Sequence, residues 1–236
     1  MERYKEAFIE FLIETGALRF GEFTLKSGRI SPYFFNAGQF SGGEEIERLG
    51  HYYACAVEAL CEMPSILFGP AYKGIPLCVS TAIALRQHFN VEVHYCFDRK
   101  EVKTHGEAGS LVGKIPDDTD TLVMVDDVVT DGTTKAMAVA RLKEVSDARI
   151  LGLVIALDRK ERNAEGSNAV AVLEQSIGVK IRSIVTIHDI IDYLRNRSIH
   201  GEILHTDETL RRIGDYLRRY GVEDEDGGGA GGRSQQ

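Results

Sequence analysis

The stretch at residues 120–134, together with the helical pattern that follows it, constrains the fold more than any other part of the chain. The unbroken apolar run at 122–125 is typical of a parallel strand buried on both faces, and the apolar spacing at 135–145 predicts a helix. Asp126 and Asp127 stand where the strand ends. A strand that passes through a short loop into a helix is the building unit of an α/β protein with a mostly parallel sheet.

The loop at 130–134 has the chemistry of a phosphate site. It offers hydroxyl groups, a glycine that permits close backbone approach, and amides at a helix N-terminus. Asp126 and Asp127 would repel a phosphate, so we expect them to contact sugar hydroxyls or a Mg²⁺ ion that bridges the ligand. A plain strand followed by a capped helix would explain one acid here, but two adjacent acids before Thr-x-Gly-Thr-Thr favour a ligand site.

This stretch resembles the phosphoribosyl-pyrophosphate (PRPP) motif of type I phosphoribosyltransferases, in which a hydrophobic run precedes two acids and a Thr/Gly-rich loop. The resemblance implies that the loop holds the 5-phosphate and that the two acids hold the ribose hydroxyls. The implied substrate-binding residues are Asp126, Asp127, Val128, Val129, Thr130, Asp131, Gly132, Thr133 and Thr134. Asp131 departs from the small neutral residue common in the orotate-type members, so we expect its carboxylate to point to solvent.

Composition limits the remaining possibilities. A chain of 236 residues, 43% of them hydrophobic, suits one α/β domain. The net charge of −8 argues against a general affinity for nucleic acid or an anionic membrane, so an anionic substrate must meet a local basic cluster. Four cysteines without a C-x-x-C pair, no signal peptide and no transmembrane run predict a cytoplasmic protein with reduced thiols. The scattered histidines argue against a zinc site.

The N-terminal residues, 1–40, combine a helical pattern at 3–15 with an alternating pattern around a Ser-Gly turn at 20–38. They predict a packing helix and a hairpin over the edge of the sheet. The hairpin resembles the hood of the orotate phosphoribosyltransferases, which implies that Lys26 contacts PRPP and that Phe34 and Phe35 hold a flat pyrimidine. Aromatic faces suit a planar base, although both rings could equally be core residues.

A second turn between a strand and a helix lies at 69–76, after a predicted helix at 44–61 and before one at 77–89. A lysine and consecutive amides in such a turn suit a pyrophosphate, although Gly-Pro turns are common and the signal is weak alone. The turn resembles the pyrophosphate loop of the orotate enzymes, which implies that Tyr72 and Lys73 bind PRPP.

A charged segment at 98–113 follows a predicted strand at 91–97, and such a charge run is usually a solvated loop. Here it concentrates positive charge in an acidic chain, and it resembles the mobile catalytic loop, or lid, of the orotate family. The resemblance implies that Arg99, Lys100, Lys103 and His105 bind the substrate, and that Lys26, Lys73, Lys103 and His105 neutralise the departing pyrophosphate. The implied catalytic residues are Lys103, His105, Asp126 and Asp127.

The last part of the chain predicts strands at 148–157 and 181–187, and helices at 188–197 and 208–220 on the flank of the last strand. Arg159 would be a surface arginine in most proteins, but the resemblance implies that it contacts the carboxylate of the base. The acidic, glycine-rich tail at 223–236 is expected to be disordered and has no assigned function.

Four motifs in the family's order thus resemble the orotate phosphoribosyltransferases over residues 3–222. The resemblance implies a type I phosphoribosyltransferase fold: one α/β domain at 1–222, with a mostly parallel sheet flanked by helices and a small hood mainly at 1–40. It implies Mg²⁺-dependent transfer of phosphoribose from PRPP to orotate in UMP biosynthesis, with the metal bound mainly through PRPP. It also implies a homodimer with shared active sites.

Two other functions would use the same PRPP motif. A phosphoribosyltransferase for another base should lack the Phe34-Phe35 hood and Arg159. A PRPP-sensing regulator should lack the basic segment and usually adds a basic nucleic-acid surface. Both alternatives conflict with residues that the chain contains.

Overall fold

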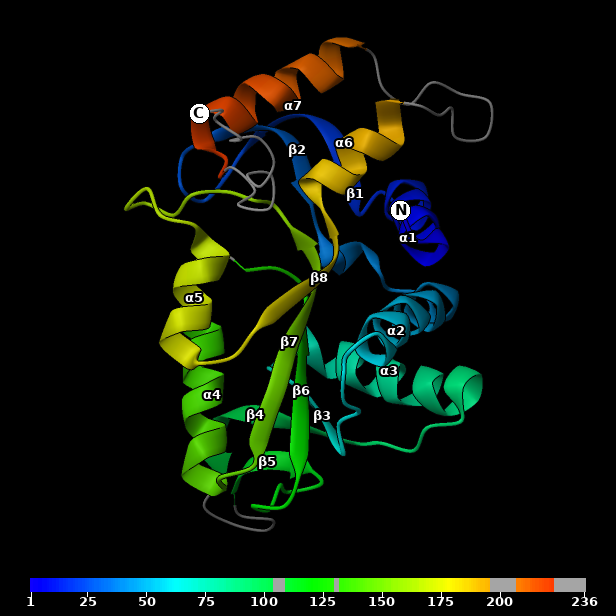
Figure 1. The fold of residues 1–236 in the computed structure, drawn as a ribbon, viewed down its shortest axis with the longest axis vertical. Coiled ribbons are helices and arrows are strands. Elements are labelled where there is room, and N and C mark those ends of the chain that lie inside the picture. The colour runs from blue at the N-terminus through cyan, green and yellow to red at the C-terminus, as the bar shows by residue number, and fades with distance from the viewer. Residues whose placement is uncertain (104–108, 130–131, 196–206, 223–236) are drawn as a thin grey trace, which may run out of the picture.

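The computed structural model describes residues 1–103, 109–129, 132–195 and 207–222, and its centre is a six-stranded sheet (Figure 1). The strand order is β5-β4-β3-β6-β7-β8. The bounds are β3 (Ile66–Gly69), β4 (His94–Lys103), β5 (Gly109–Gly113), β6 (Thr121–Asp126), β7 (Arg149–Asp158) and β8 (Ile181–Thr186). Neighbouring strands are parallel except for β4 and β5, which are antiparallel. The predicted α/β fold with a mostly parallel sheet is confirmed.

The central strands carry unbroken apolar runs because both faces of the sheet are covered. Helices α2 (Gly43–Glu58) and α3 (Gly74–Phe89) lie on one face, and α4 (Thr133–Val145) and α5 (Ala169–Ile177) lie on the other (Figure 1). Successive residues of a strand point to opposite faces. Leu67, Val123, Val125 and Val154 therefore join one core cluster, while Ile66, Phe68, Leu122, Met124 and Leu153 join the second.

The hood stands at one end of the sheet. It contains α1 (Arg3–Glu14), the antiparallel pair β1 (Leu18–Thr24) and β2 (Ile30–Phe35), and the 3-10 turn η1 (Ala37–Gln39). Two C-terminal helices, α6 (Ile187–Arg195) and α7 (Asp207–Tyr220), lie at the same end (Figure 1). The expected helix beside the last strand is α6. The same expectation is wrong for α7, whose apolar face lies against β2, with Tyr216 packed edge-on to Tyr33 at 6.1 Å.

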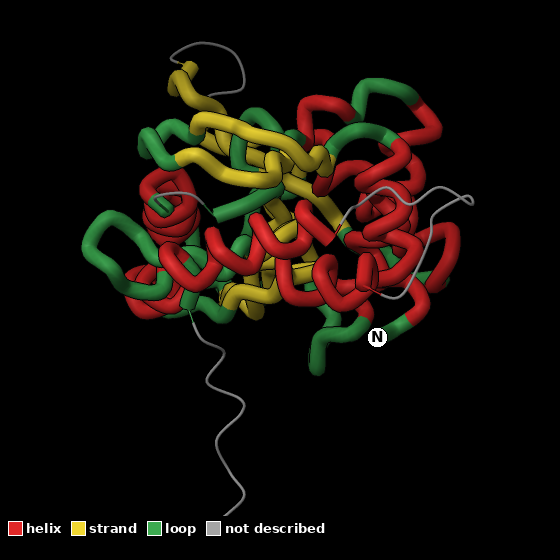
Figure 2. The backbone as a smooth tube through the Cα atoms, turned by 90° about the horizontal axis from the view of Figure 1, so that it is seen from above, coloured by secondary structure: helices red, strands yellow, loops and turns green. Residues whose placement is uncertain are grey.

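The segment after residue 97 corrects the expectation of a long loop, since β4 continues through Lys103 and pairs with β5. Ladder bonds form between backbone groups, so strands with charged side chains can pair where they are exposed. Figure 2 shows this ribbon extending beyond the helices of the domain. One helix, α5, had no counterpart among the predicted elements, although Asn168 caps it through two backbone amides and Gly178 ends it. No helix in the described ranges has the length and apolar character needed to cross a membrane.

Candidate active site

The two adjacent acids lie at the carboxyl edge of the sheet, as the sequence predicted. Asp126 ends β6 and Asp127 follows it, with 6% and 8% of their surfaces exposed. Their backbone is fixed from both sides: the Tyr53 hydroxyl donates to the Asp126 carbonyl at 2.7 Å, and the Ala156 amide donates to the Asp127 carbonyl at 2.9 Å. The carboxylates are therefore held by the sheet and by α2.

Each of these carboxylates is paired with a lysine. Lys135 Nζ lies 2.7 Å from Asp126 Oδ2, and Lys73 Nζ lies 2.6 Å from Asp127 Oδ2. The first pair is buried, whereas the Lys73 side chain is 55% exposed. Burial raises the pKa of Asp126, and the charge of Lys135 opposes that rise. Lys73 can therefore leave Asp127 for a ligand more readily than Lys135 can leave Asp126.

Lys135 was missed as a site residue, although the sequence carried a signal for it. It stands three, four and seven positions before Ala138, Val139 and Leu142, which form the buried stripe of α4. A lysine on an apolar helical stripe needs a buried partner. The two acids at the end of the preceding strand were the obvious candidates, because a buried strand end can place them beside the buried face of the helix.

Close backbone packing shapes the turn at 69–76. A Cβ atom on Gly69 would lie 2.1 Å from the Gly74 carbonyl oxygen, so only glycine fits there. The peptide bond between Ala71 and Tyr72 is cis. The Ala71 amide donates to Asp98 Oδ1 at 2.6 Å, and Arg141 Nη1 donates to Asp98 Oδ2 at 2.7 Å. Asp98, another residue that sequence reasoning missed, thus ties the turn to β4 and α4.

The expected phosphate loop leads into the N-terminus of α4. Gly132 precedes the helix in the left-handed region, with φ of 77°, and Thr133 and Thr134 are exposed in the first turn. Val128 and Val129 are half-buried between Asp127 and this turn. Thr130 and Asp131 lie outside the described residues. The helix N-terminus therefore opens to solvent five residues after Asp127, a suitable place for an anion.

Arg159 follows β7 and reaches the hood. Its Nε and Nη2 donate to Glu161 Oε1 at 2.9 and 2.7 Å, and Nη2 also donates to Ser31 Oγ at 3.1 Å. Its guanidinium carbon lies 4.3 Å from the centre of the Tyr33 ring. Burial raises the pKa of Tyr33 well above its ordinary value, so this hydroxyl stays protonated. Glu161, Ser31 and Tyr33 had not been selected from the sequence.

The two hood phenylalanines do not share a face. Phe35 is 8% exposed and belongs to the core, whereas Phe34 is half-buried and stacks on Phe23 with 5.5 Å between ring centres. Alternation along β2 separates them. Lys26 is exposed in the hairpin turn, and no hydrogen bond joins it to the acids or to Arg159 in the described part of the chain.

The basic segment is described only in part. Arg99 lies on β4, and its carbonyl accepts a hydrogen bond from Arg141 Nη1 at 3.3 Å. Lys100 and Lys103 also lie on β4, and His105 lies outside the described residues. Over the ranges that the structure describes, no group of three or more His, Cys, Asp or Glu side chains is arranged to hold a metal ion.

Comparison with known proteins assigns this geometry to a family. The orotate phosphoribosyltransferases of Clostridium beijerinckii and Colwellia psychrerythraea are each 44% identical to the chain, over 94% of this chain and 100% of each relative. The chain belongs to the orotate phosphoribosyltransferase family. It is therefore a pentosyltransferase of a family that serves pyrimidine biosynthesis. The family resemblance found in the sequence is confirmed.

Solved structures of the family agree with this fold. The crystal structure of the orotate phosphoribosyltransferase of Francisella tularensis matches with a TM-score of 0.80 and 34% identity, over 92% of this chain and 100% of that one. The Mycobacterium tuberculosis orotate phosphoribosyltransferase in complex with PRPP, at 18% identity and a TM-score of 0.57 over 79% of this chain and 98% of that one, shares the fold. No protein-family model matches the chain.

Proposed function

We propose that the protein transfers the phosphoribosyl group of PRPP to N1 of orotate, releasing pyrophosphate and forming orotidine 5′-monophosphate on the route to UMP. The observation that carries this proposal is the pairing of Lys73 with Asp127 at 2.6 Å, beside the open N-terminus of α4. A carboxylate for sugar hydroxyls, a cation for pyrophosphate and a helix N-terminus for a phosphate lie together there. These groups complement the parts of PRPP.

The substrate contacts follow from that arrangement. Asp126 and Asp127 accept hydrogen bonds from the ribose hydroxyls, and the residues from Val128 through Thr134 surround the 5-phosphate. Lys73 and Tyr72 meet the pyrophosphate from the turn at 69–76, and Lys26 approaches from the hood. When PRPP binds, Lys73 moves from Asp127 to the pyrophosphate, so the acid becomes available to the sugar as the lysine leaves it.

Orotate is placed by the hood and by the end of β7. Arg159 donates to its carboxylate, and Phe34, which is half-buried, offers a ring face to the planar base. Phe35 supports the backbone of β2 from the core side, and that backbone reads the edge of the base. Holding base and sugar in line supplies much of the rate enhancement, because the reaction needs no covalent nucleophile.

The basic lid completes the site. Arg99, Lys100, Lys103 and His105 neutralise the pyrophosphate as its bond to C1 of the ribose loosens. Closure of the lid excludes water, which otherwise competes with orotate as the nucleophile.

The donor set fits a magnesium ion that arrives with the substrate. Asp126 and Asp127 each bind a backbone amide through Oδ1 and a lysine through Oδ2. Neither acid presents an oxygen without a protein contact, and Mg²⁺ commonly binds substrate phosphates and water with few protein ligands. When bound, Mg²⁺ supplies positive charge to the pyrophosphate. Asp126 and Asp127 would meet it through the ribose hydroxyls.

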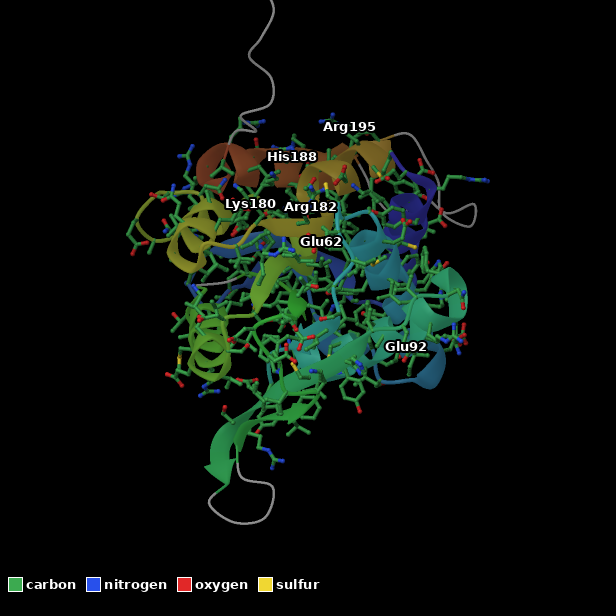
Figure 3. The ribbon with its side chains drawn as sticks, turned by 60° about the horizontal axis from the view of Figure 1, so that its bottom comes forward. Glu62, Glu92, Lys180, Arg182, His188 and Arg195 are labelled. Atoms are coloured by element: carbon green, nitrogen blue, oxygen red, sulfur yellow. The ribbon has the colours of Figure 1, made fainter. Side chains whose placement is uncertain are left out.

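A homodimer with shared sites is supported by an exposed apolar stripe that begins in the turn before α3 and continues along that helix. Tyr72 in the turn and Pro76 and Ile83 on the helix are exposed, Tyr72 and Ile83 by 67% and 52%, while Val79 between them is half-buried against the core. The stripe begins beside Lys73, so a second copy packed on it would stand next to the candidate site. The β4–β5 ribbon projects away from the body of its own domain (Figure 3), as a lid that serves the second copy would require.

A cytoplasmic location is supported by the thiols. All four cysteines are free, as expected for a protein kept in a reducing compartment.

The test is an absorbance assay. Incubation with PRPP, Mg²⁺ and orotate should remove the orotate absorbance, and the Arg159→Ala variant should need far more orotate for the same rate. Adenine, hypoxanthine and uracil serve as alternative acceptors. Turnover of one of these in place of orotate would favour a phosphoribosyltransferase for another base. Saturable PRPP binding without any turnover would favour the regulator.

A further inference from the structure

We propose that Glu161 is a positioning residue for orotate binding, because it fixes Arg159 so that one end of the guanidinium is left for the carboxylate of the base. The inference rests on the proposed function, since it requires Arg159 to contact orotate. Glu161 itself acts through Arg159 and does not touch the substrate.

The hydrogen bonds of Arg159 decide which end remains. Of the five N–H groups on a guanidinium, Nε carries one and each terminal nitrogen carries two. Glu161 Oε1 takes the Nε group and one group of Nη2, at 2.9 and 2.7 Å, and Ser31 Oγ takes the other group of Nη2 at 3.1 Å. The other terminal nitrogen, Nη1, takes no part in these three hydrogen bonds, and the buried hydroxyl of Tyr216, a neutral group, lies close to both Arg159 and Glu161. The carboxylate of a ligand therefore meets Arg159 at Nη1.

The plane of the guanidinium is fixed as well. The Tyr33 ring lies under it at 4.3 Å, and the Tyr33 hydroxyl donates to the same Glu161 oxygen at 3.1 Å. The side chains of Arg159 and Glu161 are 16% and 13% exposed, so water competes little for these bonds. The Tyr33 ring, the Glu161 carboxylate and the Tyr33 hydroxyl that binds this carboxylate together hold the Arg159 guanidinium in one orientation.

Glu161 is in turn held by the chain end. Its backbone forms a β-bridge with Gly221, while the Arg162 amide donates to the Tyr220 carbonyl at 2.8 Å and the Val222 amide donates to the Lys160 carbonyl at 2.9 Å. Arg29 Nη1 lies 3.8 Å from the second Glu161 oxygen. A glutamate fixed through its own backbone can fix its partner, whereas one on a free loop could not.

An arginine already oriented loses little conformational freedom when the ligand binds, and it rejects ligands that lack the matching group. Two consequences follow for a variant that frees Arg159. Orotate should bind less well, and the preference for orotate over uracil, which lacks the carboxylate, should fall. Both effects concern the base, and PRPP should be unaffected.

The test compares Glu161→Ala, Glu161→Gln and Glu161→Asp by steady-state kinetics with orotate, PRPP and uracil. In Glu161→Ala the KM for orotate should rise between about tenfold and about 100-fold with an unchanged KM for PRPP. In Glu161→Gln the amide oxygen still accepts hydrogen bonds from Arg159. The KM for orotate should therefore lie much closer to the parent's value than it does in Glu161→Ala. Glu161→Asp keeps the charge but withdraws it by one methylene. It should raise the orotate KM, which keeps the test decisive even if the alanine variant fails to fold.

Glu62→Ala is the matched control. Glu62, labelled in Figure 3, pairs with Arg149 through two hydrogen bonds of 2.6 and 2.9 Å. Arg149 begins β7, the strand that leads to Arg159. The control substitution therefore also removes a glutamate that pairs with an arginine, but at the opposite end of this strand. Its orotate KM should match that of the parent protein.

Three results would overturn the inference: an unchanged orotate KM in Glu161→Ala or Glu161→Asp, a parallel rise in the KM for PRPP, or a glutamine variant no better than alanine. The proposed function fails separately, since a parent protein that does not consume orotate refutes it before any variant is made.

Discussion

Lys135 Nζ lies 2.7 Å from Asp126 Oδ2, and only 7% and 9% of the two side chains are exposed. Replacing Lys135 by Met would leave a buried carboxylate without its cation. We expect Lys135→Met to lower the free energy of unfolding at pH 7 by about 3–5 kcal/mol, measured by urea denaturation. Burial already raises the pKa of Asp126, and loss of Lys135 would raise it further. The deficit should therefore shrink as pH falls through that pKa and the acid takes up a proton.

The double variant Lys135→Met/Asp126→Asn is the control for this prediction. It removes both charges, so it should recover more than half of the stability lost by the single variant. If the double variant were as unstable as the single one, the loss would come from packing around residue 135 and not from an unpaired charge.

The other pair of the site should behave differently. Lys73 is 55% exposed, so its ion pair with Asp127 is screened by solvent, and Lys73→Ala should change the free energy of unfolding by less than about 1 kcal/mol. Turnover should suffer instead, with kcat/KM falling by the equivalent of about 1.5–3 kcal/mol, because a charged contact to pyrophosphate is lost. Calorimetry and initial rates on the same preparation separate the two effects. A melting temperature lowered as far as in Lys135→Met would show that Lys73 serves the fold.

Asp127→Asn should weaken PRPP binding and turnover and leave the fold intact. Asparagine has the size of aspartate, and the Oδ2 atom of Asp127 faces Lys73, which is exposed, so the fold should tolerate the change. The substitution does remove the negative charge that strengthens hydrogen bonds from the ribose hydroxyls. Titration with PRPP and Mg²⁺ measures the effect, with the exposed Asp192→Asn as the control. A PRPP titration curve that matches the parent's would refute the placement of the ribose.

Thiol labelling should separate the four cysteines by burial. Burial raises the pKa of Cys78 and of Cys96 to about 12, whereas Cys61 is exposed. The thiolate is the form that reacts with iodoacetamide, so at pH 8 the native protein should be labelled at Cys61, more slowly at Cys55, and at the two buried thiols only after unfolding. Peptide mass spectrometry reads the sites. Equal labelling of Cys78 and Cys61 in the native protein would contradict the described core.

Complementation tests the shared site of the proposed dimer. Lys73→Ala damages the pyrophosphate turn and Lys103→Ala the lid, so each homodimer should be nearly inactive. In a hybrid, one site collects both lesions and the other neither. Random exchange makes half of the dimers hybrids, so mixed subunits should recover about a quarter of the parent's activity. If labelled subunits exchange and activity stays at the level of the separate variants, each lid serves its own chain.

The sequence predicted those helices and strands whose burial produces a recognisable pattern of apolar residues. Leu122 and Val123 point into different cores, so the apolar run revealed a two-sided strand. The β4–β5 ribbon produced no such pattern, because its strands pair through their backbones while the sequence of the segment is rich in charged residues. Hydropathy records burial and not pairing, which is why this segment looked like a loop.

Contacts between distant residues were the other limit. Ser31 and Arg159 are 128 positions apart, and Lys73 and Asp127 are 54 apart. The resemblance selected Lys73, Asp127 and Arg159 by motif, but Glu161 and Lys135 are defined only by the partner that the fold brings to them. Of these two, only Lys135 left a local sign, a cation on an apolar helical stripe.

The bridge between Gly221 and Glu161 also sets an order of events during synthesis of the chain. The sheet edge with Asp126 and Asp127 is complete once β7 has left the ribosome, because its strands and α2 come earlier in the sequence. The loop that carries Arg159 must wait for residues 220–222, which emerge after every strand of the sheet. A product released early by a premature stop before Gly221 would keep the acidic edge but would lack the support of Arg159. The cell would then contain a chain in which the acidic part of the site is formed and the part around Arg159 is not.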